Sequence, residues 1–555
     1  MPMFTLDAYA ARSCALKTHN AFHPGMVRPE PADTGRLPGS SEFTAEAYRR
    51  ILAGRAGVAD LRALSGEPGE VQEQACLAAM AAGTPVIIGG LLPRDWEGHR
   101  SGRADLLVRD PAGGYFPGMV KYQRLTDPRK DDLPYHYSDL DDLTTRLTGT
   151  GRRYRWHWRW ANTLQLAHLW RLLGPTGHQA AAGPWALAVG NDDIDGAVRA
   201  SWLDLTEAAA PANPEQLAAA AQPSQVSALA RYDHEFAARV RLAGTAAAAA
   251  PEDPPLLRPI VSHECGYCAW WEVCRPLLDD DDLSLRINKS PLDAHEISVL
   301  REAGVATVHE LAASDLELLL PSYLPRVTHR TGAEDRLRLA QRRSQLLLDG
   351  VVLERNTTGP IALPSAPLEI DVDVETSRDD RVYLWGFWVA DGNGGGSYRQ
   401  FSSFGELDDA GERELARSAM AWLRAQVTGT EALVFHYSDY EVVRLARLAT
   451  PGDELMEWAL AFARERFHDL FGTVRQHFFG TNGLGLKVVA TAGAGFHWRD
   501  DDPGGLNSMR WFEEAVGAPS AAAREQARTR LLEYNEDDVR ATWQLRRWLR
   551  EQHRG

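Results

Sequence analysis

Residues 367–377, PLEIDVDVETS, alternate between acidic and apolar side chains. Successive side chains of a β-strand point to opposite faces, so the alternation predicts a strand with Ile370, Val372 and Val374 on one face. The side chains expected on the other face are those of Glu369, Asp371, Asp373 and Glu375. Like charges side by side repel, so the pattern indicates that something positive lies against this face.

Other segments predict further strands and helices of an α/β protein. EVQEQACLAAMAAG has the composition of a helix that Gly83 ends, and PVIIGGLL, ADLLVR and GGYFPGMVKYQRL are typical of strands that follow it. EISVLREAGVATVHELA predicts two short helices around Gly304. RVYLWGFWV predicts a strand that forms a hairpin with the acidic strand, and ALVFHY predicts a buried strand. Residues 528–552 predict a helix at the end of the chain.

Length and composition indicate several globular domains. The chain has 555 residues, of which 44% are hydrophobic and 25% charged. The formal net charge of −16 argues against a protein that coats nucleic acid indiscriminately, although it leaves room for local basic grooves. The first residues lack the pattern of a signal peptide, and Gly83, Pro85 and Gly89 interrupt the most apolar window. We therefore expect no membrane span and a cytoplasmic location.

Three segments near the end of the chain carry candidate catalytic side chains. Asp373 and Glu375 form D-x-E on the predicted strand, and Glu441 follows the strand ALVFHY at the start of a helix. Tyr534 and Asp538, in EYNEDDV, are four residues apart and so share one face of a helix. Converging carboxylates can hold two Mg²⁺ or Mn²⁺ ions, and a phenol one turn away can orient a water molecule. D-x-E alone is equally compatible with an acidic edge strand in solvent.

Together these segments resemble the DEDDy exonucleases of the ribonuclease-H-like superfamily. FHYSDYEVVRL resembles their second motif, although His436 stands where Asn is usual and Tyr440-Glu441 replace Phe-Asp. Residues 483–516 also resemble the version of this domain found in RecB-like bacterial nucleases. The resemblance implies metal-dependent 3′→5′ hydrolysis of phosphodiesters, with DNA as the expected substrate and RNA as an open alternative. It assigns the metals to Asp373, Glu375, Glu441 and Asp538, and the water to Tyr534. Glu369 and Asp371 precede the motif and are expected to support the ligands or to be solvated.

Five cysteines raise a second question of metal binding. Cys265, Cys268 and Cys274 form C-x₂-C-x₅-C, and three thiolates need a fourth ligand. Cys76, within an alanine-rich helix, is expected to be a buried free thiol. One early cysteine, Cys14, and a late group of three resemble the [4Fe-4S] staple of RecB/Cas4-type nucleases. The alternative is a zinc site with His263 or Cys14 as the fourth ligand.

The same resemblance implies a PD-(D/E)xK restriction-endonuclease-like domain between these cysteines. Asp105 and Lys121 stand where its acid and lysine are expected, and Glu73 could be its accessory acid. The residue two before Lys121 should be acidic but is Met119, and a thioether does not replace a carboxylate for Mg²⁺. We therefore expect a nuclease fold whose own site is inactive, with rescue by a displaced acid as the alternative.

A basic and aromatic segment, RRYRWHWRW at residues 152–160, has the composition used to bind single strands. Arginines would contact phosphates and aromatic rings would stack on bases, but alternating tryptophans are equally typical of a core.

The complete prediction is a multidomain α/β protein of three parts. A RecB/Cas4-like domain spans residues 1–285, a helix-hairpin-helix-like module 286–360, and a ribonuclease-H-like DEDDy domain 361–555. The predicted function is metal-dependent exonuclease activity in DNA repair or processing. The alternative is a non-catalytic nucleic-acid-binding scaffold built from two decayed nuclease folds.

Overall fold

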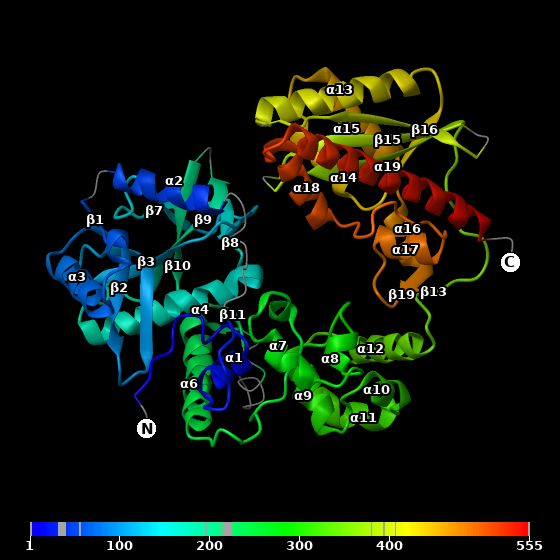
Figure 1. Ribbon diagram of the computed structural model, residues 1–555. Coiled ribbons are helices and arrows are strands. Elements are labelled where there is room, and N and C mark those ends of the chain that lie inside the picture. Colours follow the sequence, from blue (N-terminus) through cyan, green and yellow to red (C-terminus); the bar gives the residue numbers. More distant parts are fainter. Residues whose placement is uncertain are drawn as a thin grey trace. The chain divides into compact units, whose positions relative to one another are not determined.

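The computed structural model describes residues 3–30, 40–54, 57–194, 197–212, 214, 225–378, 380–391, 394–405 and 407–552. The chain forms two compact units, and each is described by itself (Figure 1). The first contains residues 1–286 and 291–340, and the second contains residues 287–290 and 341–555. The expected middle module, 286–360, is thus divided between the two units, most of it lying in the first.

A mixed eight-stranded sheet forms the centre of the first unit. Its order is β1-β2-β3-β4-β9-β10-β6-β7. The bounds are β1 Val58–Asp60, β2 Val86–Asp95, β3 Arg100–Arg109, β4 Tyr115–Val120, β6 Tyr135–Asp139, β7 Leu147–Gly149, β9 Trp185–Ile194 and β10 Ala197–Asp204. β2, β3 and β4 form an antiparallel meander, and β4 pairs in parallel with β9. Two short hairpin-like pairs join β5 (Thr126–Pro128) to β8 (Arg152–Tyr154) and β11 (Ala208–Pro211) to β12 (Gln225–Ser227).

Helices provide the parallel crossover and cover this sheet. The larger ones are α2 Ser40–Leu52, α3 Gly69–Ala81, α4 Trp156–Leu173 and α6 Ala228–Ala247. α4 lies between β4 and β9 along the chain, as a parallel connection requires. Apolar side chains of α3 and α4 pack with those of β2 and β3 in one buried cluster. Gly83, with φ of +68°, ends the α3 segment in a left-handed conformation that glycine adopts at little cost.

Further helices belong to the first unit. They are α1 Ala15–Phe22, α7 Trp271–Cys274, α8 Leu283–Arg286, α9 Ala294–Glu302, α10 Val308–Ala313, α11 Leu316–Tyr323 and α12 Ala333–Leu348, the last of which continues into the second unit. α9 and α10 are the two predicted helices around Gly304, whose φ is +82°. Asp293 and Thr307 begin these helices with complete capping boxes.

The second unit contains a five-stranded sheet ordered β16-β15-β14-β17-β18. Its strands are β14 Leu368–Thr376, β15 Val382–Ala390, β16 Gly396–Ser402, β17 Ala432–His436 and β18 Phe467–Asp469, and a separate pair joins β13 Leu353–Arg355 to β19 Phe478–Gly480. β14, β15 and β16 are antiparallel, whereas β17 and β18 run parallel to β14. The acidic segment is therefore the central strand.

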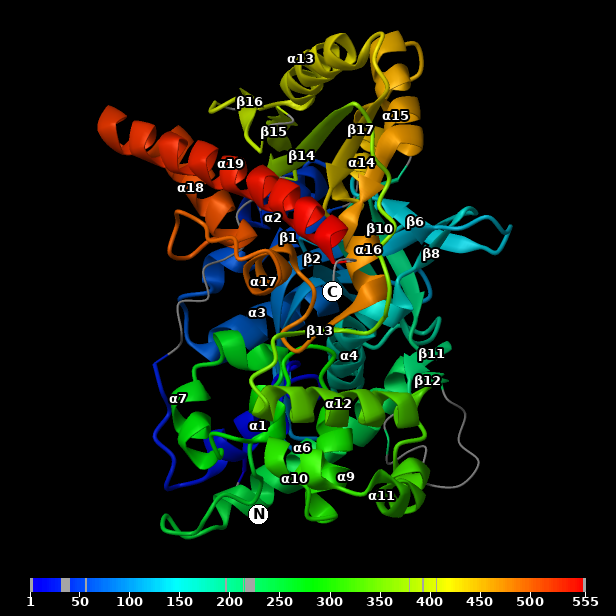
Figure 2. The same ribbon diagram turned by 90° about the vertical axis from the view of Figure 1, so that its right-hand side faces the viewer.

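Helices cover both faces of this sheet (Figures 1 and 2). They are α13 Asp409–Val427, α14 Tyr440–Leu448, α15 Glu454–Arg466, α16 Leu470–His477, α17 Leu486–Ala492, α18 Gly505–Gly517 and α19 Ala521–Glu551. Ile370, Val372 and Val374 pack with apolar residues of α13, α14 and α15. The acidic face of β14 points to α19 instead, as the two-residue period predicts.

Within the described part of the chain, no helix combines the length and the apolar character needed to cross a membrane.

Candidate active site

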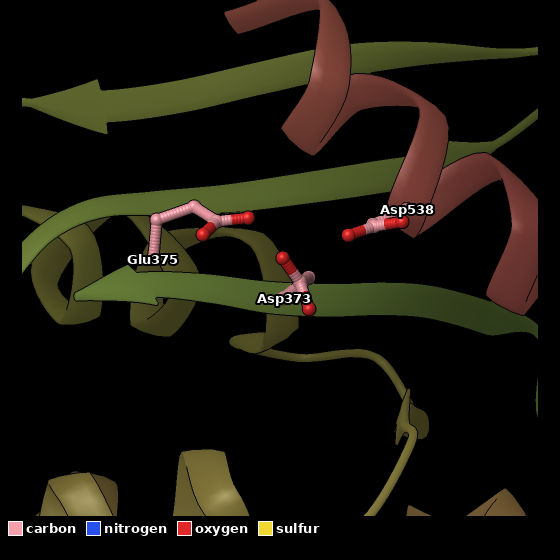
Figure 3. A group of neighbouring side chains, drawn as sticks. All are labelled: Asp373, Glu375 and Asp538. Atoms are coloured by element: carbon pink, nitrogen blue, oxygen red, sulfur yellow. The ribbon is translucent and has the colours of Figure 1, made fainter. Parts of the chain in front are cut away.

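Three carboxylates converge between strand β14 and helix α19 (Figure 3). One ligand oxygen from each of Asp373, Glu375 and Asp538 lies within 4.8 Å of the other two. Among the described residues, no other three His, Cys, Asp or Glu side chains meet this criterion. Mutually repelling charges gathered at this spacing are the arrangement that a divalent cation stabilises.

The strand register leaves space beside Asp373. Gly386 of β15 is its cross-strand partner, and a Cβ atom there would lie 1.7 Å from Oδ1 of Asn535. Without that atom, the Asn535 amide of α19 reaches the strand and donates a hydrogen bond of 2.7 Å to Asp373 Oδ2. Tyr398 donates to the other end of the amide at 2.8 Å, which fixes its orientation.

The other two carboxylates also accept hydrogen bonds from neutral groups. Ser508 Oγ of α18 donates to Glu375 Oε2 at 2.8 Å, and the Trp498 indole donates to Asp538 Oδ1 at 2.6 Å. Neutral donors hold the oxygens in place without cancelling their charge. The negative charge that these neutral donors leave on the carboxylates favours binding of a cation.

Burial makes the charged forms of these acids unfavourable. It raises the pKa of Glu375 to about 8, and Asp538 adds to the rise. Burial and then the charges of Asp538, Glu375 and Glu441 hold the pKa of Asp373 well above its usual range. The pKa of Asp538 is also raised by burial, although Lys487 opposes the shift. A bound divalent cation would favour the ionised forms of all three.

Glu441 lies outside this group of three but near it. Its charge raises the pKa of both Asp373 and Glu375. His436 Nδ1 lies 3.3 Å from Glu441 Oε2. Burial lowers the pKa of His436, but the Glu441 carboxylate contributes to a larger opposite effect, so the pKa of His436 is raised. Oε2 is buried and accepts no hydrogen bond from the described residues, and His436 is its close polar neighbour. His436 and Glu441, two of the three residues that depart from the usual motif, therefore lie next to each other.

Tyr534 and Asp538 lie together on one face of α19, as their spacing predicts. Lys487 Nζ donates a hydrogen bond of 2.9 Å to the Tyr534 hydroxyl and lies 3.4 Å from Asp538 Oδ1. Tyr534 is buried, and burial followed by the Asp538 charge raises its pKa. The phenol is therefore a neutral hydrogen-bonding group, suited to orienting a water molecule.

The first two acids of β14 are paired with arginines of α19. Arg546 contacts Asp371 through Nε at 3.1 Å and Nη2 at 2.7 Å. Glu369 accepts from Arg546 and, at 2.6 and 2.8 Å, from Arg550. The expectation that these acids could be solvated is thus wrong, because two cations from the end of α19 neutralise them.

Four cysteines line one pocket of the first unit: Cys14, Cys265, Cys268 and Cys274. Trp270, Trp271 and Ile260 are among the apolar side chains around them. No three of these sulfur atoms lie within 4.8 Å of one another, and neither do two of them with a nitrogen of His263, within the described chain. Cys76 lies elsewhere, in the core beside Met80, where burial raises its pKa to about 12.

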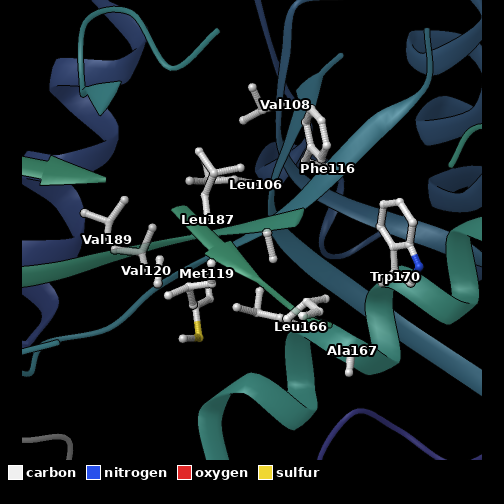
Figure 4. Packing of buried hydrophobic residues seen from close by; sticks show 14 of the residues in the cluster. Leu106, Val108, Phe116, Met119, Val120, Leu166, Ala167, Trp170, Leu187 and Val189 are labelled. Carbon is white, nitrogen blue, oxygen red and sulfur yellow. The ribbon is translucent and has the colours of Figure 1, made fainter. Parts of the chain in front are cut away.

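The candidate residues of the first unit form an incomplete site. Asp105 accepts a hydrogen bond of 2.9 Å from Val120 N, and burial raises its pKa while Lys121 opposes the rise. Glu73 instead faces Arg94, at 3.5 Å. Met119 is 3% exposed and packs among apolar residues of β3, β4, β9 and α4 (Figure 4). An acid in that position would be surrounded by hydrocarbon.

The basic and aromatic segment spans β8 and the start of α4. Trp156 and Trp160 pack against the hydrophobic core, and Arg155 pairs with Asp127 at 2.9 Å. The side chains of His157 and Trp158 lie outside the described residues. Part of this segment therefore serves the core.

A family model described as the RNase H superfamily matches residues 371–550, which include the acidic strand β14 and most of α19. The match supports an RNase-H-like domain in the second unit. This match indicates a nuclease-like function for the second unit. No curated protein and no solved structure matches the chain significantly.

Four residues of the site were not singled out by the sequence: Lys487, Trp498, Ser508 and Asn535. The first three lie in the segment 483–516, which resembles RecB-like nucleases. That resemblance pointed to the segment but did not assign a role to any residue in it. Asn535 directly follows Tyr534, on a different face of α19. None of them belongs to a carboxylate motif, so only the tertiary structure shows where they point.

Proposed function

We propose that the second unit is a metal-dependent 3′→5′ exonuclease of the DEDDy type, acting on DNA. The convergence of Asp373, Glu375 and Asp538 is the observation that carries the proposal. The buried Oε2 of Glu441, which accepts no hydrogen bond from the described residues and lies 3.3 Å from His436 Nδ1, supports its assignment as a fourth ligand. Mg²⁺ or Mn²⁺ suits these oxygen donors, and such ions activate water and stabilise the leaving oxygen in two-metal hydrolysis.

The remaining groups would position the reactants. Tyr534 would hold the attacking water through its hydroxyl. Asn535, Ser508 and Trp498 would keep the carboxylate oxygens fixed, because their hydrogen bonds restrain the ligands without neutralising them.

End-labelled strands test this proposal with the full chain. Single-stranded DNA labelled at its 5′ end should shorten stepwise in Mg²⁺, whereas the same strand labelled at its 3′ end should release the label at once. EDTA should stop both reactions. Release of the 5′ label first would overturn the polarity, and no degradation of DNA or RNA in Mg²⁺ or Mn²⁺ would favour a binding scaffold. The same assay with end-labelled RNA strands decides whether DNA or RNA is the preferred substrate.

We infer that the first unit has a PD-(D/E)xK nuclease fold with an inactive site. The helix α3, the meander β2-β3-β4, the crossover α4 and the parallel strand β9 support the fold. Met119 supports the loss of activity, because its place within the core leaves Asp105 without a neighbouring acid on β4.

We further propose that Cys14, Cys265, Cys268 and Cys274 hold a [4Fe-4S] cluster. Four cysteine thiolates are the usual ligand set of such a cluster, and these four thiols line one pocket together with Trp270 and Trp271. Asn20 Nδ2 lies 3.9 Å from Cys274 Sγ and Ser262 N lies 3.4 Å from Cys265 Sγ, as donors to cluster sulfurs do.

Protein purified without oxygen should then be brown and contain about four irons per chain. Cys14→Ser should lose the colour and the iron, because one of the four ligands is replaced by a hydroxyl. Cys76→Ala is the matched control and should keep both, since Cys76 lies outside the pocket. Colourless protein with one zinc per chain, by elemental analysis, would contradict the cluster.

A further inference from the structure

A single lysine side chain reaches the group of carboxylates in the second unit. Lys487 belongs to α17 and lies beside Tyr534 and Asp538, which belong to α19. Its side chain is 34% exposed, against 7% for Asp538, so it approaches from the solvent side. Its charge lowers the pKa of Asp373, Glu375 and Asp538 alike.

The directions of the hydrogen bonds follow from the chemistry of the groups. An ammonium can only donate, so the Tyr534 oxygen accepts from Lys487 at 2.9 Å. Because this lysine occupies an acceptor position of the Tyr534 oxygen, the phenol must donate its own proton away from Lys487. Lys487 thereby restricts which way the hydroxyl of Tyr534 is turned.

Two aromatic rings hold the ammonium in this place. Nζ lies 4.8 Å from the centre of the Tyr534 ring and 5.3 Å from that of Trp498. Trp498 also donates to Asp538, so one indole restrains both the lysine and the carboxylate. The ammonium therefore has a defined position, which an exposed lysine in solvent would lack.

We propose that Lys487 is a positioning residue with two linked tasks, an inference that rests on the proposed metal-dependent nuclease. Without metal it is the counter-cation of Asp538. With a divalent ion bound, Asp538 would be a ligand of that ion instead of a partner of Lys487. Lys487 would keep its hydrogen bond to Tyr534, and this bond would hold the phenol in place for the attacking water. The lysine and the ion compete for one carboxylate, so each weakens the binding of the other.

Thermal unfolding of the full chain tests the competition without any measurement of activity. Lys487→Met keeps the length of the side chain and removes its charge. In EDTA this variant should unfold at least ~3 °C below the wild type. Saturating Mn²⁺ should raise its unfolding temperature by more than it raises that of the wild type, because the ion replaces the missing cation. Lys487→Arg should behave as the wild type, and so should Arg464→Met, which removes an exposed cation of α15.

An equal loss for Lys487→Met in EDTA and in Mn²⁺ would overturn the proposal, because it would make Lys487 merely structural. This comparison decides the matter even if the wild type cleaves no strand, in which case the nuclease assignment alone would fail. Failure of Mn²⁺ to shift any of the proteins would overturn the competition even if strands were cleaved.

Hydrolysis tests the second task. Lys487→Met and Tyr534→Phe should each lower kcat by roughly a hundredfold, the lower end of the range for a positioned proton-handling group. The double variant should lose no more than the more damaging single change, since the lysine acts through the phenol. A loss in the double variant equal to the product of the two single losses would show that Lys487 does not act through Tyr534.

Discussion

Asp373→Asn should reduce hydrolysis of labelled DNA by roughly 10³-fold or more. Asp373 lies between Glu375 and Asp538 in Figure 3, so its replacement would take one negatively charged oxygen donor from the candidate metal site. Metal ions contribute several kcal/mol of transition-state stabilisation, and each 1.36 kcal/mol corresponds to a factor of ten in rate. Single-turnover rates in Mg²⁺ and Mn²⁺ measure the loss.

The same substitution should stabilise the protein in EDTA, which separates a catalytic defect from a folding defect. Glu375 has a pKa of about 8 in the folded chain, against 4.5 for its ordinary value. The folded state therefore binds the proton more tightly, and stability falls as pH rises from about 4.5 to about 8. Burial and then the neighbouring acids also hold the pKa of Asp373 well above its usual range, and Asp373→Asn removes this second titrating group, so its stability should differ less between pH 6 and pH 9 than that of the wild type.

The Asp373→Asn protein also reveals any activity of the first unit. We expect none above background, because Met119 supplies no ligand there. Residual cleavage that disappears on adding Asp105→Asn would show that the first unit is an active nuclease, and that a displaced acid serves in place of residue 119.

Arg546→Met should cost about 3–5 kcal/mol of unfolding free energy, the range found when one partner of a buried ion pair is removed. The Arg546 side chain is 2% exposed and that of Asp371 is fully buried. Two hydrogen bonds join them, and the guanidinium lies 4.4 Å from the centre of the Phe435 ring. Removal of the arginine leaves Asp371 without its cation inside the core. Urea unfolding in EDTA measures the cost.

A double variant isolates the cause of this loss. Asp371→Leu combined with Arg546→Met should recover most of the stability, because no unpaired charge is then left and apolar side chains fill the space. Arg540→Met is a control on the same helix, since Arg540 is more exposed and lies 3.9 Å from its acid, Asp537. A cost below 1 kcal/mol for Arg546→Met would mean that Asp371 finds another partner.

The sequence predicted those features that depend on local periodicity. The alternation of β14 placed Ile370 on one face and Asp373 on the other, and the spacing of Tyr534 and Asp538 placed both on one face of α19. These arguments need only the geometry of a strand or a helix. The match of residues 371–550 to the RNase H superfamily agrees with the predicted class of the second unit.

Contacts between distant segments could not be predicted in this way. Asp371 and Arg546 are 175 residues apart, and only the packing of α19 on β14 brings them together. The segment AGTAAAAAPEDPP, residues 243–255, has a composition typical of a flexible connection, yet its first residues belong to α6, which continues to Ala247. Alanine has the highest helix propensity, so a run of alanines next to a helix extends it before Pro251 stops it.

Strand β14 is divided along its length. Its first two acids, Glu369 and Asp371, are neutralised by arginines from within the chain, whereas Asp373 and Glu375 are left for cations from solution. The acids that pair with α19 are therefore separate from the acids proposed to hold metal ions. A lineage could lose the second pair and still inherit a well-folded domain. Duplicated nuclease domains could in this way be retained as adaptors long after catalysis was lost, and the intact anchor would hide the loss from any comparison based on fold.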